Sequence, residues 1–125
     1  MTANEPWADL YRDLLVTAAS FHGESCPGAA LAVRMAALAM THWRIGPRVP
    51  ELQVVVGEDG CVTDALQGIT GATLGRGRLQ IGRGPEYRLS YGAEALTFQL
   101  SPARPPTIQA ILEAPADELF AVEPS

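Results

Sequence analysis

The stretch Phe21-His22-Gly23-Glu24-Ser25-Cys26-Pro27-Gly28 decides how the rest of this chain is interpreted. It brings a histidine, a carboxylate and a thiol close together, and its proline and glycine then lead into an apolar, alanine-rich run. Proline is favoured in the first turn of a helix, because the N–H that it lacks would have no partner there. The order of residues therefore predicts a loop that delivers ligand-type side chains to the start of a helix.

Helices are predicted on both sides of this loop. Before it, residues 6–20 place apolar side chains three and four positions apart, which is typical of an amphipathic helix. After it, the run from Pro27 to about Trp43 is rich in alanine and has Arg34 as its single interior charge. So many small residues allow close approach on more than one face, and we expect this helix to be central and largely buried.

The second half of the chain is predicted to alternate between strands and short helices. Leu52–Val56 is apolar and β-branched, as expected for a buried strand, and a short helix capped by Thr63 or Asp64 follows it. Three later segments alternate apolar and polar residues between glycine- and proline-containing turns, which predicts a three-stranded antiparallel meander over residues 79–81, 87–91 and 95–100.

The C-terminal part is predicted to be helical and short. Thr107 is placed to cap a helix over residues 108–113, and residues 117–120 are expected to add one more turn before a frayed end. N-terminal helices, a strand, a helix, a meander and a last short helix together define an α+β fold. With 125 residues, we expect a single domain over residues 1–125.

Composition excludes several classes of function. The chain is 47% apolar and 18% charged, as in an ordinary globular protein. Its net charge is −5 and no run of Lys or Arg is present, so a nucleic-acid surface is not expected. No apolar stretch reaches the roughly 18 residues of a membrane span. The N-terminus also lacks the basic start and apolar centre of a secretory signal, so we expect a cytoplasmic protein.

The chain has two cysteines, Cys26 and Cys61, and both lie at predicted helix starts. We expect these two helix starts to meet and form one site, at which the positive end of the helix dipole lowers a thiol pKa below its usual ~8.5. Thiolates with an imidazole and a carboxylate suit Zn²⁺ or a similar late transition metal. His22, Cys26 and Cys61 are therefore the preferred ligands, with Glu24 as a fourth candidate.

Four further polar residues are candidates for lining the same cleft. Asp64 and Gln67 lie one turn apart on the short helix beside Cys61, and Thr70 and Thr73 belong to a glycine-punctuated loop. Each has a structural alternative, as a helix cap, a surface residue or a turn residue. The loop lacks the lysine and Ser/Thr pattern of a phosphate-binding P-loop, so its glycines indicate tight turns.

These motifs resemble a known family. The opening stretch, followed by Ala32-Val33-Arg34-Met35-Ala36, resembles the FHGHxCPGxxxGxRM signature of the FmdE family, whose name comes from formylmethanofuran dehydrogenase. Residues 61–67 and 70–77 resemble its second block, C-x-x-D-A-I/L-Q followed by TGCTxGKGN. The resemblance runs from about Trp7 to Leu100. It implies a mixed sheet, a homodimer, and a metal, often zinc, near the motif cysteines and histidine.

The chain departs from the family pattern in three ways. Glu24 stands where the family usually has a second histidine, and Ala72 stands where it often has a cysteine. The cysteine-rich C-terminal zinc module of longer members is also missing, so the chain resembles a short form. A carboxylate oxygen at position 24 changes the ligand set that the resemblance implies.

The function that follows is a metal- or small-ligand-binding protein with a His/Cys cleft. Two alternatives stay open at this point. In the first, the chain is a thiol-dependent enzyme that uses Cys26 as nucleophile and His22 as its base. In the second, it is a non-catalytic accessory subunit of a redox metalloenzyme system. Residue patterns define neither a substrate nor a reaction.

Overall fold

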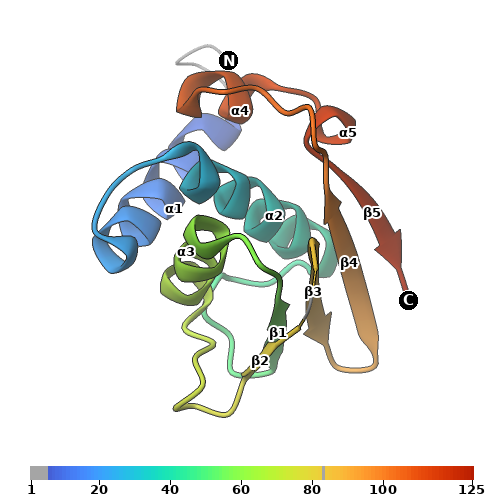
Figure 1. The fold of residues 1–125 in the computed structure, drawn as a ribbon. Helices are drawn as coiled ribbons and strands as arrows, with labels where there is room; N and C mark the ends of the chain where they lie inside the picture. The colour runs from blue at the N-terminus through green and yellow to red at the C-terminus, as the bar shows by residue number, and fades with distance from the viewer. Residues whose placement is uncertain (1–5, 83) are drawn as a thin grey trace.

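The computed structural model describes residues 6–82 and 84–125. Within these residues the helices and strands follow one another along the chain as Figure 1 shows, and their bounds are α1 Pro6–His22, α2 Pro27–Trp43, β1 Leu52–Val56, α3 Gly60–Thr70, β2 Leu79–Ile81, β3 Glu86–Tyr91, β4 Glu94–Leu100, α4 Ile108–Glu113, α5 Ala116–Leu119 and β5 Phe120–Pro124. The expected α+β class, with N-terminal helices and a mixed sheet, is confirmed.

The described strands form one sheet in the order β2-β1-β3-β4-β5. The predicted meander is wrong in one strand, because β2 pairs with β1 in parallel and does not pair with β3. The helix α3 carries the chain back between β1 and β2, and such a crossover lets two strands run in the same direction. The antiparallel part consists of β1, β3, β4 and β5.

The C-terminal end also differs from the prediction. Ala116–Leu119 forms the expected extra turn, α5, but the chain then continues as β5 in place of a frayed end. This strand pairs with β4 from Leu100↔Phe120 to Leu96↔Pro124. Backbone hydrogen bonds to the neighbouring strand hold the segment in place, and its local sequence pattern does not indicate that partner.

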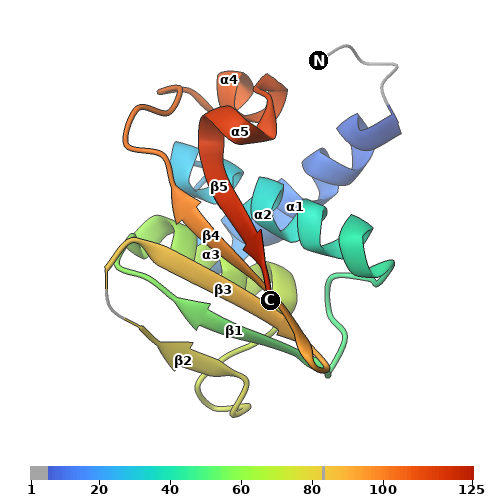
Figure 2. The ribbon, with the colours of Figure 1, turned by 90° about the vertical axis from the view of Figure 1, so that its right-hand side faces the viewer.

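The helices lie on one side of the sheet. In Figure 2 the strands face the viewer and α1, α2 and α3 lie behind them. Alternate residues of β1, namely Leu52, Val54 and Val56, are 1–2% exposed and point into the core. Tyr87 of β3 and Phe98 of β4 are fully buried there. The core therefore fills the space between the helical layer and one face of the sheet.

The helix α2 is the centre of the helical layer, as its composition predicted. Its alanines from Ala29 to Ala39 are at most 5% exposed, and both α1 and α3 pack against it. The interior charge, Arg34, is satisfied by the end of α4, where its Nη1 donates to the carbonyl oxygens of Ile111 and Ala114 at 2.7 Å each. Small side chains thus bring α1 and α3 close to α2, and this packing positions the loop between α1 and α2.

Candidate functional site

The loop Gly23–Cys26 connects α1 to α2 and carries the first thiol. Gly23 has φ +98°, a left-handed conformation that L side chains rarely adopt, and it turns the chain at the end of α1. Cys26 is the N-cap residue of α2, with extended backbone angles and no side-chain capping hydrogen bond, and Pro27 follows it as the first helical residue. The Cys26 thiol is therefore not used as a cap.

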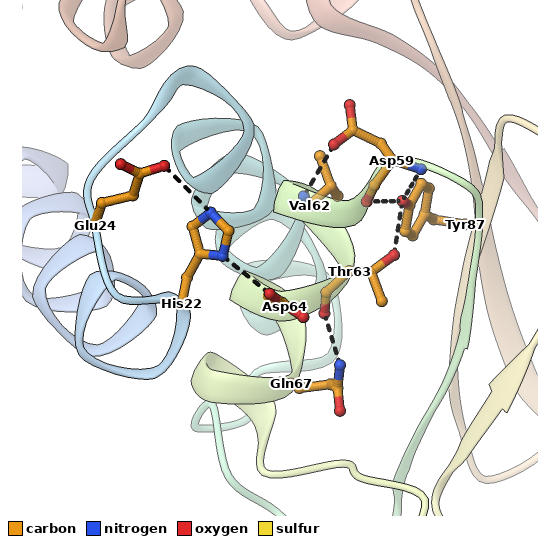
Figure 3. A network of polar contacts seen from close by, with 8 residues as sticks. All are labelled: His22, Glu24, Asp59, Val62, Thr63, Asp64, Gln67 and Tyr87. Atoms are coloured by element: carbon orange, nitrogen blue, oxygen red, sulfur yellow. Dashed lines mark hydrogen bonds and ion pairs between the residues drawn. The ribbon is translucent and has the colours of Figure 1, made fainter.

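The start of α3 carries the second thiol, and it lies earlier than predicted. Asp59, not Thr63 or Asp64, is the N-cap, because its Oδ1 accepts a hydrogen bond from Val62 N at 3.2 Å. The buried Tyr87 fixes this cap, since its hydroxyl donates to Asp59 O at 2.8 Å and accepts from Asp59 N at 3.0 Å (Figure 3). Cys61 consequently lies in the first turn of α3.

The two helix starts meet, as expected. A Cβ atom added to Gly28 would lie 2.4 Å from Cys61 Cβ, so the glycine is what allows the first turns of α2 and α3 to touch. One donor atom from each of His22, Cys26 and Cys61 lies within 4.8 Å of the others. The donors of a tetrahedral zinc site lie roughly 3.3–3.8 Å apart, so small side-chain movements would close this group around an ion.

His22 is oriented toward this group by Asp64. Its Nδ1 is 3.0 Å from Asp64 Oδ2, which leaves Nε2 as the nitrogen available to a ligand (Figure 3). That Nε2 atom is buried and has no hydrogen-bond partner, and the histidine side chain is only 13% exposed. Glu24 Oε1 lies 4.0 Å from Nε2, beyond hydrogen-bond distance, on a side chain that is 70% exposed. A buried, unsatisfied imidazole nitrogen next to two thiols is what a metal site provides.

The two thiols interact, and this reverses one expectation. A side-chain hydrogen bond with Cys26, followed by burial and by the negative charges of Asp59 and Glu24, raises the pKa of the Cys61 thiol from 9.0 to about 11. The prediction that the helix start lowers this pKa is therefore wrong for Cys61. The local hydrogen bond and the nearby carboxylates outweigh the partial charge of the helix end.

The residues expected to line the cleft are divided between the two ends of α3. Asp64 is at the site, whereas the Gln67 amide turns back to its own helix and donates to Thr63 O at 3.4 Å (Figure 3). Thr70 is buried, and its hydroxyl donates to Leu66 O at 2.6 Å. Thr73 Oγ1 accepts from Arg76 N in the following loop. Thr70 follows Cys61 by nine residues, about 13 Å along the helix axis.

Three residues that support the site were not singled out from the sequence. Asp59 caps α3 and also pairs with Arg104, whose Nη2 lies 3.0 Å from Asp59 Oδ2. Tyr87 anchors the backbone of that cap from β3. For Asp59 a signal existed, because an aspartate three residues before Val62 is a capping pattern. The contribution of Tyr87 arises from tertiary packing and has no local signature.

An α+β domain with a His/Cys group at two adjoining helix starts defines a particular class of protein. The family model described as "FmdE, Molybdenum formylmethanofuran dehydrogenase operon" matches residues 21–104, which include all three donors. The chain belongs to the FmdE family.

Two known proteins extend this comparison. A probable S-adenosyl-L-methionine-binding protein from Archaeoglobus fulgidus is 40% identical over 93 residues, which cover 68% of this chain. A crystal structure of an FmdE-like protein of tungsten formylmethanofuran dehydrogenase, from Syntrophus aciditrophicus, matches with a TM-score of 0.59 and 25% identity over 81% of this chain. The present chain spans 23% of the first relative and 55% of the second, so it corresponds to one part of each.

The described helices are too short or too polar to span a membrane. Within residues 6–82 and 84–125, none is both long enough and apolar enough to cross a bilayer.

Proposed function

We propose that the chain binds one late transition metal ion, with zinc as the best fit, through His22 Nε2, Cys26 Sγ and Cys61 Sγ. The observation that carries this proposal is the buried Nε2 atom, which has no hydrogen-bond partner and belongs to a group of three donors within 4.8 Å. One nitrogen and two sulfur donors suit Zn²⁺. Burying an imidazole nitrogen without a partner costs free energy that a bound ion would recover.

Each residue has a distinct role in this proposal. The two thiols supply negative charge, His22 supplies a neutral donor, and Asp64 accepts the Nδ1–H and so fixes the ring and its tautomer. Glu24 is exposed and close to Nε2, so its carboxylate can complete the set or leave the fourth position open to a ligand. When bound, an ion with an open position supplies Lewis-acid chemistry to that ligand.

Cobalt substitution tests the ligand set directly. Metal-free protein titrated with Co²⁺ should develop a sulfur-to-cobalt charge-transfer band and intense visible bands of four-coordinate cobalt, both saturating at one ion per chain. The same titration of the His22→Ala variant should give weaker binding. His42→Ala, which removes the exposed histidine at the end of α2, is the matched control. A cobalt complex without the charge-transfer band would exclude the thiols as ligands.

Asp64→Asn should weaken metal binding by about 10- to 100-fold, because the neutral amide no longer holds the Nδ1–H of His22 as a carboxylate does. The side chain keeps its size, so the fold should be unchanged. Competition with a chromophoric chelator gives the affinity. Glu24→Gln is the companion variant, since a smaller effect there than at Asp64 would leave the carboxylate of Glu24 outside the ligand set.

Metal affinity should rise with pH. The Cys61 thiol has a pKa of about 11, so below that pH the ion must displace its proton, and each unit of pH toward 11 should strengthen binding about tenfold through this group. A pH-indicator dye in weakly buffered solution would record the released protons. Binding that does not depend on pH between 7 and 9 would contradict ligation by Cys61.

The same pKa sets the sign for the metal-free protein. The folded pKa lies above the reference value of 9.0, so the folded state favours the protonated thiol. Its contribution to stability is fully present below pH about 9 and is lost as the pH rises toward 11.

A second function is favoured by one observation, the contact of His22 with Asp64. Thiol, imidazole and carboxylate in this order also suit a nucleophilic Cys26 whose proton passes to His22 Nε2 while Asp64 holds the ring. Metal-free protein would then show fast alkylation of Cys26 near neutral pH, slowed in His22→Ala. Slow alkylation that is insensitive to His22 would exclude this alternative.

Zinc as the native ion, a homodimer and a cytoplasmic location are also part of the proposal. All three rest on the sequence and on the family resemblance. Metal analysis after purification with and without added zinc tests the first, and sedimentation equilibrium tests the second. The description of the Archaeoglobus fulgidus relative adds S-adenosyl-L-methionine to the small molecules worth titrating.

A further inference from the structure

A second cavity, lined by arginines, lies at the opposite end of α3 from the His/Cys group. Its volume is about 430 Å³, and its lining consists of Arg48, Pro50, Thr70, Gly71, Arg76 and Arg78. It forms where the loop between α3 and β2 meets the segment that leads into β1. We call it the arginine pocket.

Two of its guanidinium groups are held in place by backbone carbonyls. Arg78 is half-buried; its Nε donates to Leu52 O at 3.0 Å, and its Nη2 donates to Val49 O at 3.0 Å and to Thr70 O at 3.2 Å. Arg48 is more exposed, and its Nη2 donates to Gly68 O. These hydrogen bonds orient the two guanidinium groups before any ligand arrives.

Gly71 makes room for one of these groups. It has φ +70° at the C-cap of α3, and a Cβ atom added to it would lie 3.0 Å from Arg48 Nη1. That contact is tight for any larger residue, so the glycine serves both the left-handed turn and the position of Arg48. Arg48 Nη1 and Arg78 Nη1 make no hydrogen bond to any described residue and can donate to a ligand.

The positive charge of the pocket has no counterpart in the described part of the chain. There, the arginines that pair with carboxylates are Arg12, with Asp9, and Arg104, with Asp59. The carbonyls at the end of α3 supply a partial charge of only about −0.5. Three cations around one cavity, in a chain of net charge −5, therefore repel one another unless an anion binds between them.

We propose that the arginine pocket binds the phosphate-type dianionic group of a small molecule. Forked guanidinium donors match phosphate oxygens in pairs, and charge-assisted hydrogen bonds of this kind are the stronger ones. The volume exceeds that of the anion alone and lies in the range of small-molecule sites. Side chains would hold the group here, in contrast to a P-loop, whose backbone amides surround the phosphate.

Inorganic phosphate is the probe for this site. We would titrate it into metal-free protein at constant ionic strength, balanced with chloride, and follow backbone amide resonances and the thermal midpoint. Saturable shifts should be confined to residues 48–50 and 70–78, and the midpoint should rise. The metal-free Cys26→Ser variant should bind phosphate equally well, so failure of the metal proposal would not affect this result.

Arg76→Gln supplies the decisive variant, because Arg76 is exposed and its side chain holds no other described residue in place. It should weaken phosphate binding about tenfold. Arg88→Gln, an exposed arginine of β3 with the same loss of charge, should leave the affinity unchanged. Arg48→Lys keeps the charge but loses the fork, and should also bind more weakly. Absence of saturable shifts, or an equal effect of Arg76→Gln and Arg88→Gln, would overturn the proposal.

Discussion

Replacing both thiols, Cys26→Ser with Cys61→Ser, should abolish metal retention. Structural zinc sites with four ligands bind with about 10–16 kcal/mol, so each ligand contributes roughly 3 kcal/mol, which is about a hundredfold in affinity. Loss of both sulfurs should then weaken binding by about 10⁴-fold, and each single variant by about a hundredfold. Elemental analysis of protein purified from zinc-supplemented medium, followed by chelator competition, measures both effects.

The stability of these variants separates ligand loss from misfolding. Serine is close to cysteine in size, and Cys26 makes no side-chain cap to α2, so the metal-free variants should unfold near the metal-free wild type. The wild type alone should gain stability on adding zinc, because an ion that binds only the folded state stabilises it by mass action. If the double variant kept zinc as tightly as the wild type, the His/Cys group would not be the metal site.

The sequence was most informative where local chemistry and tertiary structure agree. Pro27 and the alanine run predicted α2 because a helix start and a buried helix each have a compositional signature. Cys61 could be placed beside Cys26 because both cysteines belong to helix starts. Each of these inferences depends on a few neighbouring residues, and the fold did not override them.

Errors occurred where the deciding contact was distant in sequence. The start of α3 was predicted too late because Asp59-Gly60 also suits a turn, and the bond from Tyr87 that stabilises the cap comes from β3. β2 has only three residues, so its parallel pairing with β1 depends on the crossover through α3 rather than on its own pattern. The raised pKa of Cys61 likewise reflects its contact with Cys26.

Gly28→Ala should damage the site without touching a donor atom. The new methyl carbon would lie 2.4 Å from Cys61 Cβ and 3.4 Å from Val62 N, both in the first turn of α3. Carbon atoms pack at about 3.5–4.0 Å, so the starts of α2 and α3 would have to separate by more than about 1 Å. Such overpacking costs about 1–3 kcal/mol, partly offset by the roughly 1 kcal/mol that alanine gains over glycine inside a helix.

The separation should affect metal binding more than stability. Metal–ligand distances tolerate deviations of only about 0.2 Å, so a displaced Cys61 should behave almost like a missing ligand and cost roughly a hundredfold in zinc affinity. Gly60→Ala is the matched control, since an added Cβ there meets nothing within 4 Å and the residue directly precedes Cys61. Chelator competition and thermal unfolding of both variants measure the two effects. Wild-type zinc affinity in Gly28→Ala would show that the approach of Gly28 to Cys61 does not set the geometry of the site.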